Sequence, residues 1–340
     1  MEETTKIIQI DRAKLEPVVK KAINNGRIIS TEGMSKEIWL GLRNIIGIGG
    51  SEVATVLGIN PYKTAYQLWK EKANDEIEVI ENKFTIWGNL LEGPVAEEYM
   101  RQTRRVLVED KKIRIHPEHN CLFVNLDRVV MEDGIAVGVV EIKTTTRRNW
   151  NHWQKDEDNC VDGVPLIYYC QCQHELSVSG LPWCDLVFAI IDERELVIKR
   201  VERDEEYIQK QNQALVGWWN AYVIQNEAPP MTAAEYSFIE PMTDSYIEAN
   251  GEIAELYANL KGKKETLKAL EKDVEKDEDK IKEYIGDKEN LVLIDKIIAT
   301  YKMQSRTGID SKKLKAEKPD VFTEYSKTTQ FRTLRLKEIN

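Results

Sequence analysis

Three charged side chains, Asp127, Glu141 and Lys143, flank an Asp-Gly pair at 133–134 near the middle of the sequence. Asp-Gly between two alternating apolar runs is a strong hairpin signal. Pairing the runs about this turn sets Asp127 opposite either Val140 or Glu141, and in the second register the two carboxylates are cross-strand neighbours about 5 Å apart at Cβ. Lys143 lies two residues further on the same face, about 7 Å away. The pattern predicts two carboxylates and an ammonium group on one patch of a strand pair.

Two carboxylates this close repel each other, so one must hold a proton unless a cation lies between them. A hard divalent ion with oxygen ligands removes the conflict, and Lys143 could then hold a water molecule or a phosphate oxygen. The alternative is an ordinary exposed strand face, on which Lys143 forms a salt bridge with one carboxylate. Apolar neighbours such as Phe123 and Val129 indicate that the face is buried, and burying a carboxylate pair without a metal is costly. This favours a metal site.

A third carboxylate, Glu92, lies in a segment predicted to be helical from Trp87 to Gln102. Apolar side chains cover about half of this helix at roughly 100° per residue, and Glu92 lies in the middle of their arc. Glu97 and Glu98 fall at or beyond its edges, where solvated charges belong. Because charged residues are rarely buried alone, Glu92 is either a further metal ligand or a buried carboxylate paired with an arginine.

Gln171 lies in another predicted helix, which runs from Asp162, a suitable N-cap, to Ser179, with Pro165 in its first turn. It shares a face of this helix with Tyr168. A glutamine here could orient water or contact a phosphate, or it could be a core or interface residue.

Periodicity and capping predict the elements that position these residues. Residues 6–26 form a strand or arm and then a helix capped by Asp11. The region from about 37 to 228 mixes strands and helices, and its last helix begins near Asp204 and ends before Pro229-Pro230.

From about Asp244 to Tyr284 the sequence is highly charged, with apolar residues at a seven-residue spacing. The first seam position holds Ile253, Leu260, Leu267, Val274 and Ile281, and the second holds Leu256, Leu270 and Tyr284. This spacing is typical of a coiled coil or helical hairpin. Beyond it the sequence predicts a hairpin at 291–301, a lysine-rich helix at 311–317 and a strand at 329–336.

Composition excludes several classes of protein. The 340 residues are 42% hydrophobic and 31% charged, typical of a folded chain of about two domains. No apolar run approaches the ~20 residues that cross a bilayer, and no secretory leader is visible, so we expect no membrane partner. Five cysteines at low density fit the reducing cytoplasm. They include no Cys-x-x-Cys, and Cys170 and Cys172 point apart on a predicted helix, so we expect no iron–sulfur cluster.

The net charge of −10 argues against a protein coated with nucleic acid but allows a local basic groove. Eleven basic and five acidic residues give 296–340 a net charge of +6, whereas 1–295 carry −16. An acidic body with a basic tail indicates an anionic partner near the C-terminal end.

The acidic residues and the lysine match the D…(D/E)xK constellation of the PD-(D/E)xK nuclease superfamily, and the fuller pattern resembles the YqaJ-like viral recombinases, related to phage lambda exonuclease. The matching motifs are Trp39–Arg43, Ile48–Gly58, Trp87–Glu92, Asn125–Asp127, Glu141–Lys143 and Tyr168–Gln173. They occur in the right order with sensible spacing across about 36–226. One departure is Arg128, where the family often has Gly; another is the region after about 228, which lambda exonuclease lacks.

The resemblance implies an α/β (α+β) fold: a restriction-endonuclease-like core with a mixed central sheet flanked by helices, a C-terminal coiled-coil region and a small β-α-β tail. We expect an N-terminal arm and helix over 1–35, the nuclease core over 36–230, the helical region over 231–286 and the basic tail over 287–340.

The resemblance also implies two Mg²⁺ ions per site, with Mn²⁺ as an alternative. Asp127, Glu141 and the main-chain oxygen of Ile142 would hold one ion. Asp127 and Glu92, partly through water, would hold the second. Lys143 would orient or deprotonate the attacking water.

Further roles follow from the same resemblance. Gln171 would assist in placing the water, and Arg43 with Ser51 would grip the 5′-phosphate of the digested strand. The glycines before Ser51 precede a predicted helix at 53–57, whose N-terminus is an anion site in general. Taken alone, Ser51 fits a helix cap and Arg43 a surface ion pair.

The implied activity is a Mg²⁺-dependent DNA exonuclease working 5′→3′ on double-stranded ends for phage-type recombination, in the cytoplasm of a bacterial host. The expected partners are double-stranded DNA, further copies of the chain in a trimeric ring, and a single-strand annealing protein. An endonuclease or nickase with the same site is an alternative. So is a non-catalytic DNA-binding assembly protein, against which the intact Asp127, Glu141 and Lys143 argue.

Overall fold

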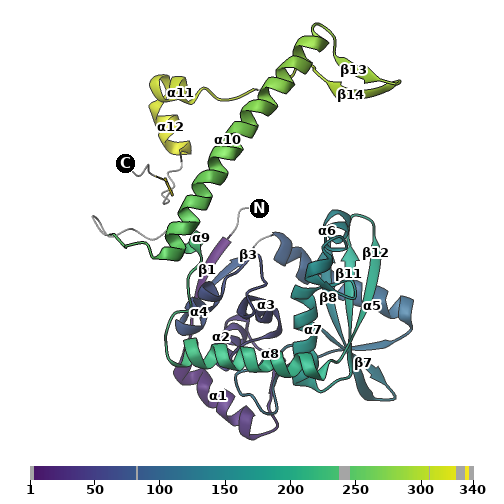
Figure 1. The fold of residues 1–340 in the computed structure, drawn as a ribbon. Helices are drawn as coiled ribbons and strands as arrows, with labels where there is room; N and C mark the ends of the chain where they lie inside the picture. The colour runs from purple at the N-terminus through teal and green to yellow at the C-terminus, as the bar shows by residue number, and fades with distance from the viewer. Residues whose placement is uncertain (1–3, 82, 237–245, 306, 327–333, 337–340) are drawn as a thin grey trace. The chain divides into compact units, whose positions relative to one another are not determined.

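The hairpin predicted at residues 133–134 forms as expected in the computed structural model. Asp133 and Gly134 adopt φ values of 50° and 80°, the backbone that a tight two-residue turn requires. The structure describes residues 4–81, 83–236, 246–305, 307–326 and 334–336. It divides into two units, Met1–Met231 and Thr232–Asn340 (Figure 1), and each is described separately below.

A five-stranded sheet with the order β12-β11-β8-β7-β4 forms the centre of the first unit. The strands are β4 (Val106–Glu109), β7 (Arg128–Glu132), β8 (Ile135–Thr145), β11 (Trp183–Ile190) and β12 (Glu195–Glu202). β8 and β11 run parallel and the other neighbours antiparallel, so the expected mixed central sheet is confirmed.

Helices cover both faces of this sheet, also as expected (Figure 1). On one face, α5 (Lys83–Thr103) packs against Val140 and Ile142 of β8. On the other face, α7 (Leu166–Ser179) packs around Val139. Successive side chains of a strand point to opposite faces, which is why residues of β8 enter two separate cores.

Both registers considered for the hairpin occur in it. Arg128 pairs with Val140, which is the second register, and a bulge after Val130 shifts the pairing by one residue toward the turn. The run before the turn is not one strand, however. It splits into β6 (Phe123–Val124), which joins a separate sheet, and β7, because the chain crosses between the sheets at 125–127.

Two smaller sheets and four helices complete the N-terminal half of this unit. The sheets pair β1 (Thr4–Gln9) with β3 (Glu76–Glu81), and β5 (Lys112–Ile115) with β2 (Ile28–Ser30) and β6. The helices are α1 (Arg12–Asn24), α2 (Lys36–Ile46), α3 (Val53–Val56) and α4 (Ala65–Ala73). Asp11 caps α1 by accepting a hydrogen bond from Lys14 N–H, as predicted.

The start of α7 differs from the prediction. Asp162 does not cap it, because Asp162 and Gly163 form the positive-φ turn of a small hairpin, β9 (Cys160–Val161) with β10 (Val164–Pro165). The helix begins only at Leu166, and its residues 170–178 are all buried. Short α6 (Arg147–Trp153) precedes this hairpin, and the final α8 (Glu205–Trp218), capped by Asp204, continues as a π-helical segment over Trp219–Ile224.

The second unit contains α9 (Ala233–Tyr236) and one long helix, α10 (Gly251–Ile285). The predicted hairpin after it is present as β13 (Asn290–Leu293) and β14 (Lys296–Thr300), and the lysine-rich helix as α11 (Ser311–Glu317). A further helix, α12 (Pro319–Tyr325), was not predicted, and the strand expected at 329–336 lies largely outside the described residues. Across the described parts of the chain, no helix combines the length and apolar character needed to span a membrane.

Candidate metal and phosphate site

Asp127 lies at the edge of β8 that β7 leaves uncovered. β7 pairs with β8 only as far as Arg128 and Val140, whereas β8 continues along β11 to Thr145. Asp127 directly precedes β7, and its Oδ2 accepts a hydrogen bond of 3.1 Å from the backbone N–H of Ile142. The N–H and C=O of one strand residue point to the same side. The carbonyl of Ile142 therefore faces the same edge as the Asp127 carboxylate.

Glu141 is buried between β8 and α7, with 3% of its surface exposed. Its Oε1 accepts hydrogen bonds from Lys143 Nζ and from Gln171 Nε2, both at 2.6 Å. The same Gln171 nitrogen donates to Glu175 Oε1 at 2.9 Å. Gln171 thus joins two buried carboxyl groups and fixes the orientation of Glu141.

The carboxyl groups of Asp127, Glu141 and Glu175 lie close together in a region that is shielded from water. Burial, followed by the charge of Glu141, raises the pKa of Asp127 well above its ordinary value. Burial and Glu141 raise the pKa of Glu175 in the same way. Burial opposes the charged form of Lys143, but Glu141 and Asp127 outweigh burial and raise its pKa. A divalent cation relieves this kind of repulsion, and the two carboxylates with the Ile142 carbonyl offer the hard oxygen ligands that Mg²⁺ prefers.

Glu92 pairs with an arginine, as one of the two alternatives from the sequence expected, but it is only partly buried. It lies on α5 with its side chain 33% exposed, and Arg128 Nη1 donates to its Oε1. The same Arg128 nitrogen donates to the main-chain oxygen of Asp127 at 2.6 Å. The family departure at position 128 thus places a positive charge where Glu92 was expected to meet a second ion.

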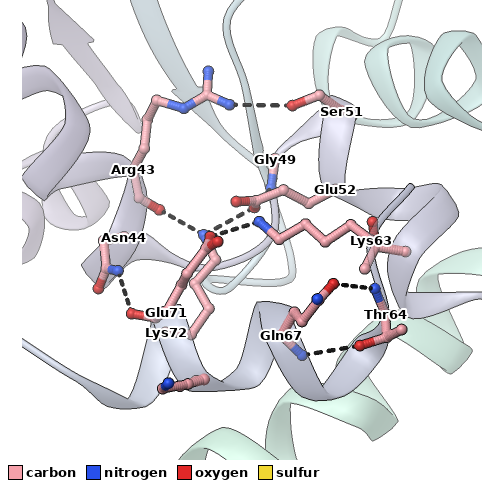
Figure 2. Close-up of polar contacts among 12 residues, drawn as sticks. Arg43, Asn44, Gly49, Ser51, Glu52, Lys63, Thr64, Gln67, Glu71 and Lys72 are labelled. Atoms are coloured by element: carbon pink, nitrogen blue, oxygen red, sulfur yellow. Dashed lines mark hydrogen bonds and ion pairs between the residues drawn. The ribbon is translucent and has the colours of Figure 1, made fainter. Parts of the chain in front are cut away.

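Arg43 and Ser51 lie next to each other, although they belong to different elements (Figure 2). Arg43 Nη2, on α2, is 3.4 Å from Ser51 Oγ, and Nη1 donates to Asn125 Oδ1 at 3.2 Å. The guanidinium carbon is 4.5 Å from the ring centre of Trp39 and 5.5 Å from that of Phe123. Arg43 is therefore held in a fixed position rather than in a surface ion pair.

Ser51 does not cap the helix that follows it, contrary to one reading of the sequence. It lies within a 3-10 turn (Gly50–Glu52), and the N-cap of α3 is Glu52. The side chain of Ser51 is instead turned toward Arg43 (Figure 2).

A buried ion pair that the sequence did not predict supports the position of Arg43. Lys72 Nζ of α4 lies 2.8 Å from Glu52 Oε2 and donates to the carbonyl of Arg43 at 3.2 Å (Figure 2). Glu52 also accepts a 2.8 Å hydrogen bond from Gly49 N–H. Burial raises the pKa of Glu52, but Lys72 and Arg43 outweigh it and lower that pKa. No sequence spacing links Glu52 to Lys72, so only the fold could reveal this pair.

Arg43 and Ser51 lie beside the buried carboxyl groups of Glu141 and Glu175. A Cβ added to Gly50 would lie 3.4 Å from Gln171 Cγ and 3.5 Å from Glu175 Oε1. The charge of Glu141 also acts on Arg43, whose pKa burial lowers. All the predicted site residues of the first unit therefore gather around the start of β7, the exposed edge of β8 and the first half of α7.

Glu175 belongs to this site but was not predicted from the sequence, although its spacing from Gln171 could have indicated it. It lies four residues after Gln171, on the same helical face. Cys172 and Cys184 also approach it, and one ligand atom from each of the three lies within 4.8 Å of the others. Two thiols and a carboxyl group are not a set that Mg²⁺ prefers.

Comparisons of sequence with known proteins agree with the resemblance. The sequence profile of the YqaJ-like viral recombinase domain matches residues 38–182. YqaJ of Bacillus subtilis (strain 168) is 31% identical over 319 residues, which cover 90% of this chain and 96% of that protein. Among solved structures, an alkaline exonuclease (LHK-Exo) from Laribacter hongkongensis is 22% identical, over 56% of this chain and 94% of that chain, with a TM-score of 0.46. A phage-related exonuclease from Haemophilus somnus 129PT is 14% identical, over 55% of this chain and all of that one, with a TM-score of 0.39.

The similarity to the Bacillus protein extends over nine tenths of this chain, beyond the stretch that the domain profile matches. Three of the motifs that carried the resemblance, Asn125–Asp127, Glu141–Lys143 and Tyr168–Gln173, are joined by the hydrogen bonds of Asp127 and Glu141. The chain belongs to the YqaJ-like viral recombinase family.

Proposed function

We propose that this protein is a Mg²⁺-dependent DNA exonuclease that digests one strand of double-stranded ends in the 5′→3′ direction. The observation that carries the proposal is the position of Asp127 beside β8, where its carboxylate accepts the Ile142 N–H next to Glu141 and Lys143. Two acidic oxygens, a carbonyl and a lysine ammonium at one strand edge suit phosphodiester hydrolysis.

The chain's own residues have separate tasks in this proposal. Asp127, Glu141 and the Ile142 carbonyl would hold one Mg²⁺, which when bound supplies positive charge to the scissile phosphate and lowers the pKa of water. Gln171 keeps the Glu141 carboxylate in place through its 2.6 Å hydrogen bond. Lys143, kept charged by its carboxylate neighbours, orients the attacking water or donates to a phosphate oxygen.

A second ion would take Glu92 and Asp127 as ligands. Glu92 is already neutralised by Arg128, so this position fills only when the guanidinium moves away. Arg128 would then be free to contact a phosphate of the bound strand, since arginine offers paired donors for such oxygens.

Arg43 and Ser51 would hold the 5′-phosphate at the end of the digested strand. Both are polar donors, they lie 3.4 Å apart, and their corner adjoins Gln171. Double-stranded DNA is the proposed substrate, in the bacterial cytoplasm during phage recombination. A ring of three copies and a single-strand annealing protein are the proposed partners.

The test compares linear and covalently closed circular duplex DNA with Mg²⁺ and with EDTA. We expect linear DNA to be digested only with Mg²⁺, mononucleotides to be released first from a 5′-labelled end, and circular DNA to survive. Nicking or cutting of the circle would replace the exonuclease by an endonuclease with the same site. Digestion in EDTA, or no digestion of either DNA alongside intact binding, would remove the nuclease proposal.

A further inference from the structure

Helix α10 carries an apolar stripe that is open to solvent. Its 35 residues make it about 52 Å long. The exposed fractions are 50% for Ile253, 60% for Leu256, 55% for Leu267, 60% for Leu270, 51% for Val274 and 45% for Ile281. Helices α11 and α12, of seven residues each, span only about 10 Å apiece and are too short to cover this stripe. An amphipathic helix of this kind gains its stability from a partner surface.

We propose that α10 pairs with α10 of a second copy in an antiparallel coiled coil. Two charged residues that interrupt the stripe favour the antiparallel direction. Lys263 and Asp277 occupy the seam position that Leu256 and Leu270 hold elsewhere on the same helix. In a parallel, in-register pair each of them would face its own copy, lysine against lysine and aspartate against aspartate. Like charges in a seam are strongly unfavourable.

The antiparallel arrangement turns both repulsions into attractions. In each layer of the seam, one residue of α10 lies opposite one residue of the partner's α10. The opposing positions are 253 and 284, 256 and 281, 260 and 277, 263 and 274, and 267 and 270, and the two-fold symmetry repeats each layer with the chains exchanged. Lys263 and the partner's Asp277 then lie in adjacent layers. The two-fold symmetry of the pair creates this contact twice.

The flanking positions favour the same direction. In the antiparallel register Lys264 lies beside the partner's Glu271, which gives two more pairs of opposite charge. A parallel pair would instead set Asp273 beside the partner's Glu278, two like charges. Within the single helix, Lys280 Nζ lies 2.8 Å from Asp277 Oδ1, and both side chains are more than 70% exposed. Such an exposed ion pair is weak, so Asp277 is free to change partners.

The first test exchanges the two seam charges in the full-length chain and measures self-association by sedimentation. Lys263→Glu sets glutamate against the partner's Asp277, and Asp277→Lys sets lysine against the partner's Lys263. We expect each single variant to weaken the pairing through α10, whether it joins two chains or two rings of three, about tenfold or more, and the double variant to restore it to within about threefold. The matched control is Lys272→Glu, which makes the same charge change on the opposite face of α10 and should leave association unchanged.

The second test locates the partner by cysteine cross-linking. In the antiparallel pair, position 256 faces 281 of the partner, while the two copies of 256 are about 38 Å apart. Leu256→Cys with Ile281→Cys should therefore cross-link into dimers, and Leu256→Cys alone should not do so beyond the wild-type background.

Three outcomes would overturn the proposal. One is a full-length chain whose association is unaffected by Leu267→Asp. Another is a double charge variant no tighter than the single ones. The third is efficient cross-linking of Leu256→Cys alone, which indicates a parallel pair or trimer. None of these measurements uses DNA cleavage, so they stand apart from the nuclease proposal.

Discussion

The guanidinium of Arg128, the first residue of β7, holds the carboxylate of Glu92 on α5, and the same side chain donates to the main-chain oxygen of Asp127. Arg128 therefore links the two residues that a second metal ion would share. Its positive charge already pairs with Glu92, so the second metal ion that we propose would have to compete with the guanidinium for this carboxylate.

Replacing Arg128 tests this competition. Without DNA, we expect the wild-type protein to bind one Mn²⁺ per chain and Arg128→Met to bind two, because the variant leaves the Glu92 carboxylate unpaired. Calorimetric titration or electron paramagnetic resonance of free Mn²⁺ gives the stoichiometry. The control is Arg101→Met, which breaks a surface pair with Glu98 on the same helix. Two ions in the wild-type protein would show that Arg128 does not block the position.

Asp127→Asn separates catalysis from stability. We expect cleavage to fall by at least about 10³-fold, since a charged ligand is lost, while the asparagine oxygen can still accept the Ile142 N–H. Burial and Glu141 raise the pKa of Asp127 in the folded state. The wild-type carboxyl therefore stabilises the fold at pH values below its unfolded pKa, and this contribution is lost as the pH rises through the folded pKa.

Asp127→Asn has no carboxyl group at this position, so it does not lose stability when the wild-type Asp127 ionises. In metal-free buffer, Asp127→Asn should become progressively more stable than wild type as the pH rises from about 4 toward neutrality. Thermal or urea unfolding at a series of pH values measures the difference. A variant that is less stable than wild type at pH 7 in the absence of metal would contradict the charge argument.

Lys143→Ala should slow cleavage by about 10²-fold or more and change the dissociation constant for DNA by less than about threefold, because orienting water acts mainly in the transition state. Single-turnover cleavage and a binding assay in Ca²⁺ give the two numbers. Lys155→Ala, at an exposed position of the same unit, controls for the loss of one charge. A variant that fails chiefly in binding would make Lys143 a phosphate anchor.

If Arg43 and Ser51 hold the 5′-phosphate as proposed, the wild-type protein should digest phosphorylated 5′ ends faster than 5′-hydroxyl ends, and Arg43→Lys should remove this preference. Lysine keeps the charge but cannot reach Ser51 and Asn125 together with two separate nitrogens, as Arg43 does. The measurement is the ratio of digestion rates on 5′-phosphorylated and 5′-hydroxyl duplexes, which we expect to fall toward one. An unchanged ratio would place the 5′-phosphate elsewhere.

The sequence alone determined the hairpin, the helix cap and the long amphipathic helix, because each depends on residues close together in the chain. The Asp-Gly turn requires positive φ, and the alternating runs on either side permit only two registers, so the approach of Asp127 to β8 was predictable. The heptads over α10 and the Asp11 cap are local in the same sense. Matching whole motifs in order also identified the family, which no single spacing could have done.

Tertiary structure decided the rest, because it depends on contacts between residues far apart in the chain. The break at 125–127 arises because the chain leaves one sheet for another, which alternation cannot reveal. Glu92 could face an ion or an arginine, and only the packing of α5 against the sheet brings it to Arg128, 36 residues away. The burial of Glu52 with Lys72 likewise follows from the close approach of distant segments. Sequence periodicity names the face on which a side chain lies, but packing alone selects the group it meets there.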